Sequence, residues 1–313
     1  MDDTYNRPHR TAALLDRHLT RHDLRSPLWR RPHRGVRTWA GVPLDAAQRV
    51  REAAALLPPH GAVGGWAAAL LHGAAGVDGE DAQGCPLPVP LCVGHGHALR
   101  RRPGIRLSAS HLPPHEVQQR AGVRVTTPAR TAFDVLRWAG SVREATAAAD
   151  LLLRHELLPR ADVLGLASER RRWEGAAQVR RALELSREGV LSPGETRLRL
   201  LWTLDAGLPE PLVNQRIEDR RGRLLGVADL LDPGSGLVAE YDGAHHRELG
   251  QHGRDNVREE LFEAHGLVVV RAVSTDLGPD RARAVARLQA GHRRALALPP
   301  GGRGWVAGGA WRP

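Results

Sequence analysis

Acidic residues cluster in the segment 224–246, LLGVADLLDPGSGLVAEYDGAHH, in a pattern that could bind a metal ion. Two apolar runs flank the turn-forming sequence DPGSG, so we expect a β-hairpin. If the loop is the PGSG that follows Asp232, then Asp229 lies opposite Glu240 on the neighbouring strand. Asp242 projects to the same face as Glu240, because side chains alternate along a strand.

Three carboxylates on one small patch raise one another's proton affinity unless a cation lies among them. Carboxylate oxygens favour Mg²⁺ or Mn²⁺, which bind one or two carboxylates, several waters and a substrate phosphate. This pattern therefore indicates a metal-dependent phosphodiesterase. The alternative is an edge hairpin whose acidic residues prevent pairing with another strand. A register shifted by one residue would turn Glu240 to the opposite face, so the prediction depends on the loop length.

The hairpin requires surrounding elements to position it, and we expect these in the order α-β-β-β-α-β-α. The first helix begins at Ser192, with Pro193 in its first turn and Glu195 three residues after the cap, which is the pattern of a capping box. Capping explains Glu195 without catalysis, and the same carboxylate is also a candidate further acid of the metal site. The remaining elements are expected as strands at 212–217 and 267–273 and helices at 255–265 and 279–298.

This order, with acids on the second and third strands, resembles the PD-(D/E)XK nuclease superfamily. More narrowly, residues 192–290 resemble the uncharacterised domain allied to very-short-patch-repair endonucleases. The matching segments are SPGETRLR at 192–199, GVAD at 226–229, VAEYDGAHH at 238–246, RDNVREELFEAHG at 254–266 and VVVRAV at 268–273. The resemblance implies that Asp229 and Glu240 bind the divalent metal and that Glu195 assists.

One position departs from the superfamily, because the usual Lys two residues after the Glu is Asp242 here. In one interpretation Asp242 and His245 form an alternative set, in which neutral His245 accepts a proton from the attacking water. In the other, the site has lost its activity and only binds. On the next helix, Arg254 and Arg258 have the spacing of a phosphate clamp, or of solvated charges that pair with neighbouring acids.

The chain before residue 190 carries a second pattern. Its parts are GGWAAALLHG at 64–73, GVRVTTPARTAFD at 122–134 and an Ala/Leu-rich helix expected at 142–155. Arg130 and Asp134 lie four residues apart on the helix that the second motif begins, so we expect them to pair. Residues 40–185 resemble the AbiEi-like antitoxin proteins of type IV toxin–antitoxin systems. The resemblance implies a toxin or defence-system partner.

The sequence therefore predicts a multi-domain α/β protein. Residues 1–40, which are polar and Arg-rich, form either a basic arm or a degenerate winged-helix segment; the arm is favoured because no second helix with a clear apolar face follows Leu24. The other expected parts are an AbiEi-like α+β domain at 41–190, a restriction-endonuclease-like αβββαβ domain at 191–298 and a disordered tail at 299–313.

Composition limits the partners and the compartment. The 313 residues carry a formal charge of +10, and all 45 basic residues are Arg, which favours a nucleic-acid partner but is also the usage of a GC-rich genome. Cys85 and Cys92 are too few for a disulfide framework in a chain of this length. No run reaches the roughly 18 apolar residues of a membrane span, so we expect a cytoplasmic protein without a membrane partner.

Together these features predict a metal-dependent DNA endonuclease. Asp229, Glu240 and Glu195 would hold Mg²⁺ or Mn²⁺, with Asp242 and His245 near the attacking water. The alternative is a DNA-binding, antitoxin-like transcriptional regulator whose nuclease fold is catalytically inactive. A third possibility is a protein-interaction module in a toxin–antitoxin or defence locus.

Overall fold

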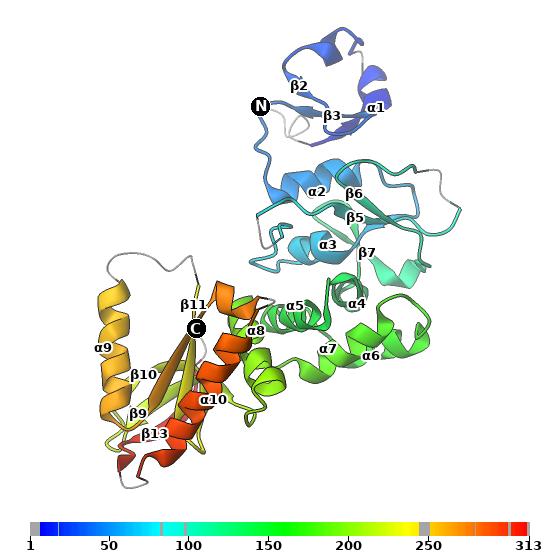
Figure 1. The fold of residues 1–313 in the computed structure, drawn as a ribbon. Coiled ribbons are helices and arrows are strands. Elements are labelled where there is room, and N and C mark those ends of the chain that lie inside the picture. Colours follow the sequence, from blue (N-terminus) through cyan, green and yellow to red (C-terminus); the bar gives the residue numbers. More distant parts are fainter. Residues whose placement is uncertain are drawn as a thin grey trace. The chain divides into compact units, whose positions relative to one another are not determined.

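The structure is a computed structural model that describes residues 7–17, 19–81, 84–96, 99–243, 251–278, 280–299 and 302–311, with the side chains of 251–256 left out. The chain divides into two compact units (Figure 1). The first unit comprises Met1–Ala139 and His155–Arg180, and the second comprises Gly140–Arg154 and Arg181–Pro313. The division does not fall at a single point near residue 190, because a helix from the middle of the chain packs with the C-terminal elements.

The first unit begins with a small antiparallel sheet in the order β1-β3-β2. Its elements are β1 (His9–Arg10), α1 (Thr11–Leu15), the 3-10 turn η2 (Asp23–Arg25), β2 (Trp29–Arg30) and β3 (Val36–Trp39). The buried apolar residues of this segment are Leu14, Leu24 and Val36. Residues 7–39 are therefore folded, and the favoured expectation of a solvated arm is wrong. A helical stretch followed by an antiparallel hairpin is the layout of the other interpretation, a degenerate winged segment.

A five-stranded mixed sheet forms the centre of the first unit, in the order β6-β5-β4-β8-β7. The strands are β4 (Ala62–Val63), β5 (Val89–Cys92), β6 (Ile105–Ser108), β7 (Val117–Arg120) and β8 (Val123–Thr126). The helices around it are α2 (Ala46–Ala54), α3 (Gly65–Leu71), α4 (Pro128–Trp138) and α6 (Arg160–Glu169), with the 3-10 turn η3 (Pro114–Glu116) before β7. Val50, Val63, Leu91 and Val125 belong to the core between α2, α3 and the sheet.

The TTPARTAFD motif has a structural role within this unit. The predicted pair forms, with Arg130 Nε 2.9 Å from Asp134 Oδ2, and Arg130 is fully buried. Arg137 Nε lies 2.7 Å from the other Asp134 oxygen, and Glu116 binds the Arg130 guanidinium from the far side. Trp173 stacks on the same guanidinium at 5.1 Å. These contacts fasten α4 to the segments before β7 and after α6.

The second unit is built on another five-stranded sheet, in the order β12-β11-β10-β9-β13. The strands are β9 (Leu212–Asp219), β10 (Leu224–Asp232), β11 (Leu237–Asp242), β12 (Val268–Val273) and β13 (Trp305–Ala310). The helical elements are α5 (Val142–Arg154), α7 (Ala176–Leu185, which crosses the division between the units), α8 (Pro193–Leu200), the π-helical turn η4 (Leu201–Asp205), α9 (Gln251–Ala264), the 3-10 turn η6 (Ser274–Leu277) and α10 (Ala282–Ala297). The predicted order α-β-β-β-α-β-α is thus present from α8 to α10.

Both faces of this sheet are covered, because successive side chains of the central strands point to opposite sides. Leu237 and Val270 pack with Leu198 and Leu288, from α8 and α10, on one face. On the other face Val238, Leu231 and Val269 pack with Phe262 of α9. The arrangement places the β10–β11 hairpin in the middle of the unit, between two helical layers (Figure 1).

The expectation of a disordered tail is wrong for residues 305–310. Strand β13 pairs antiparallel with β9, and Trp305 is only 8% exposed within the core on the α9 face. The glycines around it resemble a linker in composition, but one large aromatic side chain buries enough apolar surface to hold the strand at the sheet edge.

Candidate functional site

The hairpin has the register that the turn sequence predicts. Strands β10 and β11 pair antiparallel, with Asp232 opposite Leu237 and Leu230 opposite Ala239. The Asp232 carboxylate accepts hydrogen bonds from Gly234 N at 2.9 Å and from the Ser235 hydroxyl at 2.5 Å, so it belongs to the turn. The four-residue loop therefore sets the spacing of the acids on the two strands.

Asp229 lies at the centre of the candidate site. Its Oδ2 accepts a hydrogen bond of 2.7 Å from the backbone N–H of Tyr241, across the hairpin. Burial, followed by the nearby negative charges of Glu195 and Glu240, raises the pKa of Asp229 to about 7, although this hydrogen bond and Arg258 act in the opposite direction. Carboxylates from α8 and β11 thus contribute to the electrostatic environment of Asp229 on β10.

Glu195 makes contacts that the capping box does not fully describe. The Ser192 hydroxyl accepts a hydrogen bond from Glu195 N at 3.2 Å, as expected of an N-cap. The Glu195 carboxylate, however, accepts from Leu191 N at 2.9 Å and from Asn214 Nδ2 at 2.7 Å. Asn214 of β9, in the left-handed conformation with φ 44°, is a site residue that the sequence analysis missed. The sequence gives no distinct signal for it, because Gln215, Arg216, Glu218 and Asp219 of the same strand are also polar.

Glu240 is compensated by arginine. Arg258 Nη2 of α9 lies 3.0 Å from Glu240 Oε2, and Arg271 Nε of β12 lies 3.9 Å from the same oxygen. Gly226 of β10 makes room for this contact, because a Cβ there would lie 2.9 Å from two carbons of the Arg258 side chain. Arg258 of α9 therefore reaches across the strand to the acid. Neither Gly226 nor Arg271 was singled out in the sequence.

The remaining predicted site residues lie at the margin of the described structure. Asp242 is exposed at the end of β11, where it is opposite Val273 of β12. His245 and the side chain of Arg254 lie outside the described residues. Their proposed roles, as proton acceptor and as phosphate contact, stay predictions.

The charge balance determines what the described site can bind. Among the described residues, no group of three His, Cys, Asp or Glu side chains is arranged to hold a metal ion. Glu195 is held by Leu191 N and Asn214, and Glu240 is ion-paired with Arg258. In the described structure arginine therefore supplies the positive charge beside Glu240, and binding of Mg²⁺ or Mn²⁺ by these acids stays a prediction.

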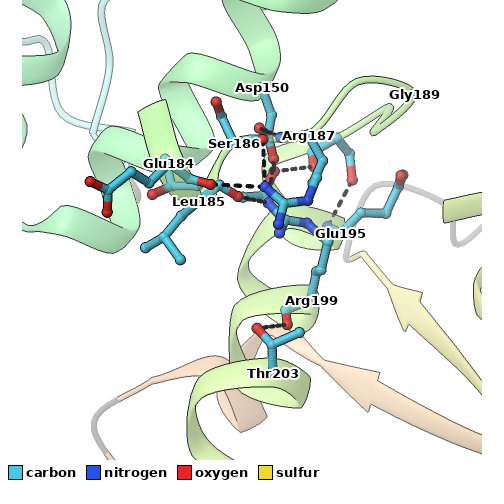
Figure 2. A network of polar contacts seen from close by, with 12 residues as sticks. Asp150, Glu184, Leu185, Ser186, Arg187, Gly189, Glu195, Arg199 and Thr203 are labelled. Carbon is cyan, nitrogen blue, oxygen red and sulfur yellow. Dashed lines mark hydrogen bonds and ion pairs between the residues drawn. The ribbon is translucent and has the colours of Figure 1, made fainter. Parts of the chain in front are cut away.

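Helix α8, which carries Glu195, is fixed by a buried polar network (Figure 2). Asp150 of α5 accepts hydrogen bonds from the Thr196 hydroxyl at 2.9 Å, from Arg199 Nη2 at 3.0 Å and from Arg187 N at 2.7 Å. Asp150 and Arg199 are both almost completely buried, and burial is the main reason why the pKa of Asp150 is raised. Thus α5 holds one side of α8 while Glu195 projects from another.

Comparison with known proteins finds a family match for part of the chain. The described fold is a mixed α/β protein with three sheets, and its second unit centres on a cluster of carboxylates and arginines. Residues 61–188 match the family model of the AbiEi antitoxin C-terminal domain, a range that contains the GGWAAALLHG and TTPARTAFD motifs. No curated protein and no solved structure matches the chain, so these comparisons give no support to the resemblance of residues 192–290 to nucleases. None of the described helices has the length and apolar character needed to cross a lipid bilayer.

Proposed function

We propose that this protein is a DNA-binding antitoxin of a toxin–antitoxin or abortive-infection system. The observation that carries the proposal is the match of residues 61–188 to the AbiEi antitoxin C-terminal domain. The matched range includes the central sheet of the first unit and the helices that follow it. An antitoxin domain implies a toxin partner, which this chain would neutralise.

Two features support DNA binding. The small sheet at residues 7–39 has the layout of a winged segment, and exposed arginines surround it, namely Arg21, Arg25, Arg31 and Arg34. The formal charge of +10 adds a general attraction to phosphate. In this proposal the first unit positions the protein on duplex DNA, as a regulator of its own operon would require.

The second unit would then bind without cutting. The Arg258–Glu240 pair supports this part of the proposal, because a guanidinium takes the position beside the acid that a divalent cation would need. The absence of the superfamily's Lys at Asp242 agrees with it. The nuclease-like order of elements would persist as a scaffold.

Two experiments test the proposal. Expression of this chain together with the toxin encoded beside it should restore growth, and purified protein should retard the duplex upstream of its own gene. The same protein incubated with plasmid and Mg²⁺ or Mn²⁺ should leave the plasmid intact. Failure to restore growth would reject the antitoxin role, and failure to retard the duplex would reject the regulatory one.

A metal-dependent endonuclease is the second candidate function. It is favoured by the pKa of Asp229, which is raised to about 7 in the company of two further carboxylates. Binding of Mg²⁺ by Asp229, Glu240 and Glu195 would require Glu240 to exchange Arg258 for the cation. Nicking of plasmid that depends on Mg²⁺ or Mn²⁺ and is lost in Asp229→Ala would establish this function in place of the scaffold.

A further inference from the structure

A groove of about 1060 Å³ lies in the first unit, where the N-terminal sheet meets α2 and the β7–β8 turn. Its walls are held together by Arg10, which donates hydrogen bonds to the carbonyls of Ala55 at 3.0 Å and Leu57 at 2.7 Å. The Arg30–Glu52 ion pair joins the same two parts of the chain. The groove is therefore bounded by elements that contact one another directly.

The charged side chains that line the groove are all positive. Arg7, Arg51 and Arg124 line it, and none of the described residues in its lining is Asp or Glu. Arg124 is held at the wall by a hydrogen bond of 3.0 Å from its Nε to the Gly61 carbonyl. Arg51, in the last turn of α2, is half-buried, and its guanidinium makes no hydrogen bond or ion pair with any residue that the structure describes. Such guanidinium groups favour an anion, above all a phosphate.

Trp39 and Gln48 also line the groove. Trp39 is partly exposed, and Trp29 contacts it edge-to-face at 5.9 Å, which leaves the groove lined by an indole. Gln48 is 1% exposed; its Nε2 donates to Glu52 at 3.2 Å, while its Oε1 accepts no hydrogen bond from the described residues. A buried acceptor without a donor costs about 1–3 kcal/mol.

We propose that this groove binds a nucleotide unit, with its base stacked on Trp39 and its phosphate on Arg51 and Arg124. Stacking on an aromatic ring combined with arginine contacts to phosphate is the recognition used for single-stranded nucleic acid. The ligand is either a free nucleotide or one nucleotide of a single strand, and both present a base and a phosphate. The site goes beyond the duplex-binding and antitoxin roles, because it lies on α2 and the β7–β8 turn rather than on the exposed arginines at 21–34.

The test measures binding of a fluorescein-labelled ten-nucleotide single strand to the full chain by fluorescence anisotropy. Arg51→Gln removes one positive charge from the groove and should weaken binding about fivefold to tenfold. Arg171→Gln is the matched control, because Arg171 is an exposed arginine of the same unit outside the groove, and it should change affinity less than about twofold. Trp39→Phe should retain more affinity than Trp39→Leu, since only the former keeps an aromatic face.

Competition identifies the source of the nucleotide. Displacement of the probe by millimolar mononucleotide supports a free nucleotide, and displacement only by unlabelled oligonucleotide supports a single strand. Equal losses in Arg51→Gln and Arg171→Gln, or no binding of either ligand, would overturn the proposal. Duplex retardation by Arg51→Gln is measured in parallel and should match the unsubstituted protein, so failure of the groove and failure of the proposed regulatory function give different results.

Discussion

Asp229→Asn should make the second unit more stable at alkaline pH and leave its stability nearly unchanged at acid pH. The wild-type carboxyl is partly buried and lies near Glu195 and Glu240, so that its pKa is raised to about 7 from a usual value of 3.8. Asn keeps the shape of the side chain and an oxygen that accepts the hydrogen bond from Tyr241 N, but it carries no charge. The substitution therefore removes the cost of ionisation and little else.

The pH dependence follows from which state loses the proton first. Between about pH 4 and pH 7 the unfolded chain is deprotonated at this position while the folded chain still holds the proton, so the free energy of unfolding falls as the pH rises. Below about pH 4 the carboxyl is protonated in both the folded and the unfolded chain, so its raised pKa does not change the free energy of unfolding. A rise of about three pKa units corresponds to at most ~4 kcal/mol at about 1.36 kcal/mol each, and partial exposure reduces the expected gain of the variant to ~2 kcal/mol at pH 8.

Urea unfolding followed by tryptophan fluorescence, at pH 4.5 and at pH 8, measures this difference. Asp242→Asn is the control, because Asp242 is an exposed carboxyl on the same hairpin and should shift neither curve. Equal destabilisation of Asp229→Asn at both pH values would refute the reasoning, since it would mean that the carboxylate stabilises the fold through its hydrogen bond. A gain of wild-type stability in millimolar Mg²⁺ at pH 8 that is absent in Asp229→Asn would favour the nuclease candidate.

Three further substitutions test the packing that positions the site. Gly194→Ala should destabilise the second unit by ~1–3 kcal/mol in urea unfolding, although Ala favours a helix, because its Cβ would overlap the Tyr241 ring; unchanged stability would contradict this contact. Arg199→Met should lower the free energy of unfolding by ~3–5 kcal/mol, because it leaves Asp150 buried without its cation. Adding Asp150→Leu should recover only part of this loss in a thermal-unfolding cycle, because Leu leaves the Thr196 hydroxyl and Arg187 N without their acceptor. Ala121→Asn should raise the melting temperature and increase the free energy of unfolding by ~0.5–1 kcal/mol. The reason is that Ala121 has φ 48° in the two-residue β7–β8 turn, where the sequence Asn-Gly is preferred. A lower melting temperature would refute the assigned turn.

Local chemistry explains what could be predicted of the hairpin. The DPGSG turn sets the loop length, and with it the pairing of Asp232 with Leu237, because strand register follows from the turn and from alternation of apolar residues. The same local signals gave the order of elements from α8 to α10. They also gave the Arg130–Asp134 pair, since residues four apart on a helix face one another.

Contacts between distant segments could not be predicted in the same way. Glu240 meets Arg258 of the next helix, 18 residues away, and the contact depends on the space left by Gly226. Glu195 meets Asn214, 19 residues away, across the start of the sheet. In each pair the two residues lie on different elements, so neither helix nor strand periodicity identifies these partners.

The sequence by itself determined which residues carry charge and which strands they occupy, because propensity, turn chemistry and alternation act over a few residues. Tertiary structure alone decided that arginine lies beside the acid at position 240, that α5 packs with α8 through Asp150, and that β13 closes the sheet through Trp305. The physical reason is that ionic and apolar groups far apart in the chain find partners only when the folded backbone brings them within contact distance. The character of the carboxylate site depends on those partners more than on the acids themselves.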